Sequence, residues 1–330
     1  MIAVVTTIQE PTDCMRRLAT ALRGADAPLL VMGDRKGPQS FDVEGAELLT
    51  LDDQLASPFE LARHLPTDYY TRKNIGYLAA IARGADCIYE TDDDNAPAPS
   101  WAPRGLAAEA RVVDAPPWLN VYRLFTDELI WPRGFPLQRI RESGAPSCGD
   151  TPVATVEAPV QQGLVDLSPD VDAVWRLTLD REFRFERRPS VLVPAGTWCP
   201  FNSQSTWWWP RAYPLMYLPS HCSFRMTDIW RSFVAQRCLW ELGHGLVVHA
   251  PEVIQERNVH DLMRDFRDEI PGYTGNEALA ERLSELTLAS GPDAAADNLV
   301  RCYEALVRAG FFPPEELDLV RSWLGDLKGL

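Results

Sequence analysis

The stretch TRKNIGYLAAIARGADCIYETDDDN (71–95) decides the fold, because an amphipathic run leads directly into a buried strand that ends in three aspartates. Apolar residues recur at helical spacing and predict a helix over 71–83, with Thr71 as its N-cap and Gly84 at its end. The apolar run CIYET (87–91) predicts the strand that follows. A helix returning the chain to a buried strand is typical of a βαβ unit.

The N-terminal residues repeat this alternation. Three apolar runs predict strands and one amphipathic run predicts a helix: 2–8, 27–34 and 46–53 for the strands, and 12–23 for the helix. The pattern indicates an α/β protein with a Rossmann-type, mostly parallel sheet flanked by helices. Ligands of such sheets bind beyond the carboxyl ends of the strands. We therefore expect Thr7, Asp34 and Asp92–Asp94, which all follow strand ends, to share one cleft.

The remainder of the chain is organised differently. Residues 96–225 are rich in Pro, Trp and Arg, and the runs at 118–125 and 172–179 resemble strands. The later elements are predicted as follows: a helix over 227–242, a strand over 245–250, and tail helices near 258–269, 276–289, 293–309 and 314–327. We expect residues 1–255 to form the domain that holds this cleft, and residues 256–330 to form a helical extension packed on it.

Composition excludes several classes of partner. A formal charge of −15 over 330 residues disfavours a nucleic-acid partner, which such a protein would repel. No apolar stretch approaches the roughly 20 residues that span a bilayer, and the first residues lack the basic flank of a signal peptide. The seven scattered cysteines indicate reduced thiols rather than a disulfide framework. We expect a cytoplasmic protein without a membrane span, whose helical tail could support a homo-oligomer.

The aspartate triplet is the first candidate site. Mg²⁺ and Mn²⁺ prefer carboxylate oxygens and commonly share their ligand shell with phosphate. Asp92 and Asp94, spaced i and i+2 after a strand, can point into one site, whereas Asp93 faces the other way, toward a sugar or solvent. The alternative is a solvated acidic turn, since the sequence DDDN also favours turns.

Two basic residues, Arg72 and Lys73, lie in the first turn of the helix predicted over 71–83. Arg72 and Lys73 oppose the helix dipole there by about 0.3–1 kcal/mol each, unless an anion is bound at the same end. A phosphate would satisfy both, and a basic surface turn paired with nearby carboxylates is the alternative. Asn74 could orient a neighbouring loop or solvate the turn.

A third group follows in the C-terminal half. Asp228, in the first turn of its helix, either stabilises the helix dipole or deprotonates or orients an acceptor hydroxyl. His249 ends a short apolar strand and is either structural or a metal ligand. In the aromatic loop 196–209, Asn202, Gln204 and Ser205 could bind sugar hydroxyls while the tryptophans stack on the ligand; alternatively, the tryptophans are core.

Long blocks of this sequence resemble the STELLO family of glycosyltransferases. These blocks are YYTRKNIGYLAAIARGADCIYETDDDN, VYRLFTDELIWPRGFPLQRI, VQQGLVDLSPDVDAVWRLT, GTWCPFNSQSTWWWPRAYPLMYLPS and FRMTDIWRSFVAQRCLW. The chain is more distantly similar to the reversibly glycosylated polypeptides, which are UDP-arabinopyranose mutases. The arrangement RKN, GAD and DDD also resembles the general pattern of GT-A glycosyltransferases.

The resemblance implies that residues 1–255 are a GT-A-like nucleotide-sugar-binding and catalytic domain. In this fold Asp92 and Asp94 would hold the metal as a DxD motif, and His249 would complete the shell. The resemblance also implies that Asp228 lies on the acceptor side, and that the nucleotide lies near Thr7, Asp34, Arg72 and Lys73. The leading hypothesis is a Mn²⁺- or Mg²⁺-dependent glycosyltransferase that uses a nucleotide sugar, namely a UDP-sugar, and an unknown acceptor. A nucleotide-sugar mutase and a non-catalytic scaffold or nucleotide-sugar sensor remain alternatives.

Overall fold

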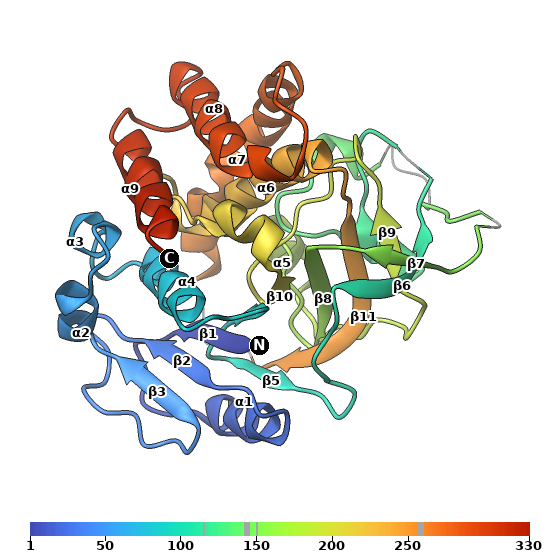
Figure 1. Ribbon diagram of the computed structural model, residues 1–330. Coiled ribbons are helices and arrows are strands. Elements are labelled where there is room, and N and C mark those ends of the chain that lie inside the picture. The colour runs from blue at the N-terminus through green and yellow to red at the C-terminus, as the bar shows by residue number, and fades with distance from the viewer. Residues whose placement is uncertain (115, 142–145, 150, 257–260) are drawn as a thin grey trace.

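The computed structural model describes residues 1–330 except 115, 142–145, 150 and 257–260. Within the described part, eleven strands form one mixed sheet in the order β3-β2-β1-β4-β10-β8-β11-β9-β6-β7, with β5 paired to β11 (Figure 1). The strands are β1 (Ile2–Thr6), β2 (Leu29–Met32), β3 (Ala46–Leu49), β4 (Ile88–Thr91), β5 (Asn95–Pro97), β6 (Ala107–Val112), β7 (Ala154–Glu157), β8 (Val160–Asp166), β9 (Val191–Val193), β10 (Ser205–Trp208) and β11 (Leu246–Gln255).

Helices cover both faces of this sheet. They are α1 (Asp13–Gly24), α2 (Leu51–Ala56), α3 (Leu61–His64), α4 (Lys73–Ala82), α5 (Ala173–Leu179), α6 (Thr227–Glu241), α7 (Leu262–Ser284), α8 (Ala295–Arg308) and α9 (Glu316–Lys328). Short 3₁₀ turns lie at Tyr70–Arg72, Val121–Leu124, Leu137–Arg139, Pro210–Met216, Phe224–Met226 and Pro292–Ala294. The C-terminal helices gather on the face that carries α4, opposite α1 (Figure 1).

The N-terminal half confirms the predicted Rossmann-type arrangement. Strands β1, β2, β3 and β4 are parallel, and alternate residues along β1 enter different cores: Val4 packs in the core with α4, and Val5 in the core with α1. Helix α4 lies so close to β1 that a Cβ at Gly76 would be 2.5 Å from a methyl carbon of Val4. The predicted fold class, a mixed sheet flanked by helices, is therefore confirmed.

Strand β10 is one of several antiparallel strands that give the sheet its mixed character. It runs antiparallel between β4 and β8, which brings the aromatic loop beside the carboxyl end of β4. Thr91 and Asn95 both donate hydrogen bonds to the Gln204 carbonyl, at 2.6 and 2.7 Å. The loop before β10 and the aspartate triplet are therefore held together, although more than 100 residues separate them.

Several sequence-based element predictions were wrong. The third strand ends at Leu49, because Thr50 and Asp53 form a capping box that starts α2. The run 118–125 contains a 3₁₀ turn, and 172–179 is helix α5, which Asp172 caps by accepting a hydrogen bond from the Trp175 amide. Side-chain caps of this kind override a short strand-like pattern.

The tail also departs from the prediction. Helix α7 is continuous through Pro271, where two separate helices were expected. The first predicted tail residues, 258–260, lie outside the described residues. Trp323 of α9 is fully buried against Tyr77 and Tyr217, so the tail shares a core with the sheet. Division of the chain at residue 255 remains a prediction.

Two predictions from composition can be compared with the structure. Among the described residues, no helix has both the length and the apolar character needed to cross a membrane. All seven cysteines are free thiols, as their scattered spacing predicted.

Candidate active site

A cavity of about 480 Å³ opens at the carboxyl ends of β1, β2 and β4. It is lined by many of the predicted site residues: Thr7, Asp34, Arg72, Asp92, Asp93, Asp94, Gln204 and Asp228. The other predicted residues, which do not line it, are Lys73, Asn74, Asn202, Ser205 and His249. The structure thus brings together residues from three strand ends and from the start of α6, as the rule for open α/β sheets predicts.

The three aspartates have different partners. Lys73 Nζ donates to Asp92 Oδ1 at 2.9 Å, and Thr7 Oγ1 donates to Asp93 Oδ2 at 2.5 Å. Gln255 Nε2, at the end of β11, donates to Asp94 Oδ2 at 3.0 Å. The triplet is therefore anchored in the cavity wall by side-chain hydrogen bonds, although Asp93 and Asp94 lie in a turn and the Asp92 side chain is 34% exposed.

Burial of these carboxyls perturbs their protonation. Burial, opposed by the nearby Lys73 ammonium, raises the pKa of Asp92 to about 7, and the Asp94 charge adds to the rise. Burial also raises the pKa of Asp93 to about 6, against the hydrogen bond from Thr7. Both shifts mean that negative charge is costly here without a further cation.

The donor set fits a hard divalent cation that takes part of its shell from outside the protein. Asp92 and Asp94 both line the cavity, and Mg²⁺ in particular is usually bound by one or two carboxylates plus substrate phosphates and water. In the described part of the chain, no group of three or more His, Cys, Asp or Glu side chains could hold a metal on its own. A site here would therefore be completed by a ligand.

His249 does not join this donor set. Its Nε2 contacts Gln161 Oε1 at 2.9 Å and its Nδ1 contacts Ser190 Oγ at 2.7 Å. Burial lowers its pKa well below the ordinary value, so the ring is neutral. With both nitrogens engaged within the sheet, His249 has the structural role that was the alternative in the sequence.

The cations at the start of α4 have internal partners. Thr71 lies within a 3₁₀ turn and is not the N-cap, because α4 begins at Lys73. Lys73 is completely buried and pairs with Asp92, not with an external anion. Arg72 donates to Gln54 Oε1 and to the carbonyls of Ala62 and Leu65, although it also lines the cavity. These contacts offset the unfavourable helix dipole from within the protein.

Asn74 orients a loop, as one of its two interpretations proposed. Its amide nitrogen donates to the Leu218 carbonyl and its amide oxygen accepts from the Leu218 amide, both at 2.9 Å. The side chain is fully buried and does not line the cavity, so it fixes the loop at Leu218 and does not contact a ligand there.

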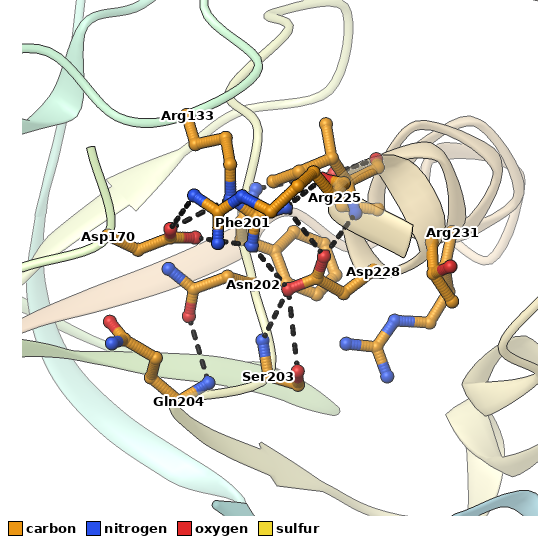
Figure 2. Close-up of polar contacts among 12 residues, drawn as sticks. Arg133, Asp170, Phe201, Asn202, Ser203, Gln204, Arg225, Asp228 and Arg231 are labelled. Atoms are coloured by element: carbon orange, nitrogen blue, oxygen red, sulfur yellow. Dashed lines mark hydrogen bonds and ion pairs between the residues drawn. The ribbon is translucent and has the colours of Figure 1, made fainter. Parts of the chain in front are cut away.

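Asp228 is held in a buried ionic network. Arg133 donates to both of its carboxylate oxygens at 2.9 Å, and to both oxygens of Asp170 at 2.8 Å (Figure 2). The Ser203 amide and hydroxyl also donate to Asp228 Oδ2, at 3.3 and 3.4 Å. Burial alone would raise the pKa of Asp228, but Arg133 outweighs burial and lowers it. A carboxylate with these partners is a weak base and a firm orienting group.

Arg133 and Asp170 are cavity residues that the sequence analysis missed. A signal was present: Arg133 is a single cation within the otherwise apolar stretch LIWPRGFPL (129–137). Charged residues are almost never fully buried unless paired, so this position predicts a buried ion pair. The identity of its partners depended on the tertiary structure.

The aromatic loop is mainly core. Trp207 and Trp208 are completely buried, and Trp209 is nearly so. Asn202 accepts from Gln162 and from the Gln204 amide, an arrangement that Figure 2 shows in part, and Ser205 contacts the Tyr89 hydroxyl. Only Ser203 and Gln204 of this loop reach the cavity. The core interpretation of the tryptophans is confirmed.

Comparison with known proteins shows what this chain is similar to. A family model described as STELLO glycosyltransferases matches residues 225–330. Over 356 aligned positions, the chain is 28% identical to "Probable glycosyltransferase STELLO1" of Arabidopsis thaliana, covering 98% of this chain and 44% of that protein. The chain is therefore similar to STELLO proteins. "Probable glycosyltransferase STELLO2" of the same plant is 29% identical over 344 positions, with the same coverage of both chains.

The STELLO match separates the site into two parts. Arg225, Asp228 and the helices α7, α8 and α9 lie within the matched family region, whereas the aspartate triplet lies outside it. The pairwise alignments with STELLO1 and STELLO2 extend over nearly the whole chain. The chain spans less than half the length of these STELLO relatives.

Proposed function

We propose that this protein is a metal-dependent glycosyltransferase whose donor is a nucleotide sugar, namely a UDP-sugar. The observation that carries the proposal is the anchored aspartate triplet in a cavity at the carboxyl ends of β1, β2 and β4. Its relatives named as glycosyltransferases support the same class of activity.

The cavity offers a role for each of its parts. Asp92 and Asp94 would hold Mn²⁺ or Mg²⁺, which would neutralise the diphosphate leaving group. Thr7 donates a hydrogen bond to Asp93, and the Asp34 carboxylate accepts hydrogen bonds from the amides of Arg35 and Tyr69. Asp93 and Asp34 are therefore held in place before a ligand binds. Preorganised polar groups of this kind lower the cost of stabilising developing charge.

Asp228 orients the acceptor in this proposal and does not deprotonate it. Its lowered pKa and the two hydrogen bonds from Arg133 make proton abstraction unfavourable. The same contacts fix the carboxylate at the cavity wall, where Ser203 also contacts it.

Calorimetry of UDP binding with and without Mn²⁺ tests the shared site. We expect UDP to bind measurably only when Mn²⁺ is present, because the acidic triplet repels a diphosphate on its own. Metal-independent binding, or no binding at all, would contradict the proposal. ADP serves as the control for the nucleotide.

Product analysis with a panel of UDP-sugars then identifies the reaction. Hydrolysis of the donor or transfer to an added acceptor supports a glycosyltransferase, and ring isomerisation of the donor identifies a mutase. Tight UDP binding without any product identifies a nucleotide-sugar sensor or scaffold.

A further inference from the structure

One aromatic ring lies exposed at the cavity. Phe224, in the 3₁₀ turn before α6, is 48% exposed and lines the cavity together with Arg225 and Asp228. Among the Phe, Tyr and Trp residues that the structure describes, it is the one whose side chain is exposed. Burying apolar surface stabilises a protein by roughly 25 cal/mol per Å², and a large apolar surface that stays exposed lacks this stabilisation. Such a surface commonly marks a binding site.

The ring is held in a fixed orientation. It makes T-shaped contacts with the rings of Tyr69 and Tyr70 at centroid distances of 5.6 and 4.9 Å and interplanar angles of 78° and 70°. Both tyrosines are tied down: the Tyr69 hydroxyl donates to the Cys222 carbonyl at 2.9 Å, and the Tyr70 hydroxyl accepts from the Asp228 amide at 3.0 Å. The Phe224 ring is therefore a preorganised surface next to Asp228.

The polar surroundings restrict what this surface can bind. Arg225, adjacent to Phe224, is held by the buried Glu269 of α7 through a hydrogen bond of 2.9 Å and an ion pair of 2.8 Å. Asp170 and Asp228, both bound to Arg133, line the same cavity. An apolar face beside fixed charged groups is complementary to a pyranose or furanose ring, which has a C–H face and a rim of hydroxyls.

We propose that Phe224 is the stacking platform of the acceptor subsite, and that the acceptor is a carbohydrate whose ring packs on it. This inference rests on the proposed function and adds the chemical class of the acceptor. It transfers to Phe224 the stacking role that the sequence suggested for the tryptophans at 207–209, which are buried and cannot contact a ligand.

Saturation-transfer difference NMR tests the platform with methyl glycosides of glucose, galactose, mannose, xylose and arabinose, in the presence of UDP and the diamagnetic cation Mg²⁺. At least one glycoside should bind the native protein. Phe224→Leu keeps an apolar side chain against the tyrosines but removes the ring, and should weaken that glycoside by about tenfold or more. Phe224→Trp should retain affinity within about threefold, since it keeps an aromatic face.

Two controls make the outcome specific. Leu129→Ala removes an exposed apolar side chain that does not line the cavity, and should leave glycoside binding unchanged. Calorimetry should give Phe224→Leu the native affinity for UDP with Mn²⁺. Loss of UDP affinity in this variant would assign the ring to the nucleotide and overturn the inference.

Two further outcomes would also overturn it: native glycoside affinity in Phe224→Leu, or a native protein that binds UDP but none of the glycosides. A native protein that binds glycosides through Phe224 but does not bind UDP would uphold the platform and refute the proposed donor. Failure of the inference and failure of the proposed function are therefore distinguishable.

Discussion

At the scale of single residues, the local sequence determines where the aspartate triplet lies, and tertiary contacts determine the environment of each carboxyl. A strand that ends in DDDN places three carboxyls at one sheet edge, which the sequence alone predicts. The partners of the three carboxyls come from 19, 86 and 161 residues away. Their unequal environments therefore could not be read from the triplet itself.

Replacing Asp92 or Asp94 by Asn should abolish the binding of UDP that Mn²⁺ supports in the native protein. Each change removes one carboxylate charge from the proposed metal site, and even outer-shell changes cost about 10–100-fold in metal affinity. Calorimetry of UDP with Mn²⁺ measures the effect. Asp127→Asn, at an aspartate whose side chain is 89% exposed, is the matched control and should bind as the native protein does. Native affinity in both cavity variants would refute the metal site.

Asp228 illustrates the opposite outcome at this scale. Its place in the first turn of α6 was predicted, but its chemical character was not. Arg133 lies 95 residues earlier, and its hydrogen bonds fix the Asp228 carboxylate and lower its pKa. Asp228 is therefore a weaker base than its sequence position suggests. The sequence identifies Asp228 as a candidate, but its protonation depends on the neighbours that it acquires in the folded protein.

At the scale of elements, the tail helices hold in place the segment that carries the cavity residues Phe224, Arg225 and Asp228. Glu316, in the first turn of α9, is completely buried and accepts hydrogen bonds from the Tyr217 hydroxyl and the amides of Ser220 and His221. Glu269 of α7 holds Arg225 in the same way. Two carboxylates from the C-terminal helices thus fix the segment that leads to Phe224 and Asp228.

The pair formed by His221 and Glu316 should make folding stability depend on pH. His221 Nδ1 contacts Glu316 Oε2 at 2.8 Å, and this hydrogen bond raises the pKa of His221 above its ordinary value of 6.5. The folded state therefore binds the proton more tightly, so the contribution is present below about pH 6.5 and is lost as the pH rises through the folded-state pKa.

Thermal unfolding between pH 5.5 and 8.5 measures this contribution. The difference in Tm between the native protein and His221→Gln should be largest at the acidic end and shrink toward pH 8.5. His64→Gln, at an exposed histidine paired with Glu60 on the surface, is the comparison variant. A difference that stays constant across the range would show that His221 does not titrate with folding.

At the scale of the whole molecule, the sheet and the helical tail share one hydrophobic core. Residues of β1, α4, α6, α8 and α9 belong to the same cluster of buried side chains. Trp323 of α9 packs against Tyr77 of α4, and its indole nitrogen donates to the Pro214 carbonyl at 3.0 Å. A boundary at residue 255 would cut through this core.

Truncating Trp323 to Ala should destabilise the entire protein by about 3–5 kcal/mol, because it removes a fully buried indole from the shared core. Calorimetry should show one unfolding transition in the native protein, which moves as a whole to lower temperature in the variant. Leu330→Ala, at an exposed terminal residue, should leave it in place. Two transitions, of which only one shifts, would establish an independently folding tail.

The sequence by itself determined the Rossmann-type half, the helix that begins at Thr227 and the strand end that carries the aspartates, because these depend on local periodicity. Local patterns misjudged 118–125 and 172–179, where capping and packing outweigh a short apolar run. Only the tertiary structure decided that Lys73 pairs with Asp92, that Arg133 clamps Asp228, and that Phe224 stays exposed while three tryptophans are buried. Each of these depends on contacts between distant residues, whose geometry a linear pattern does not contain.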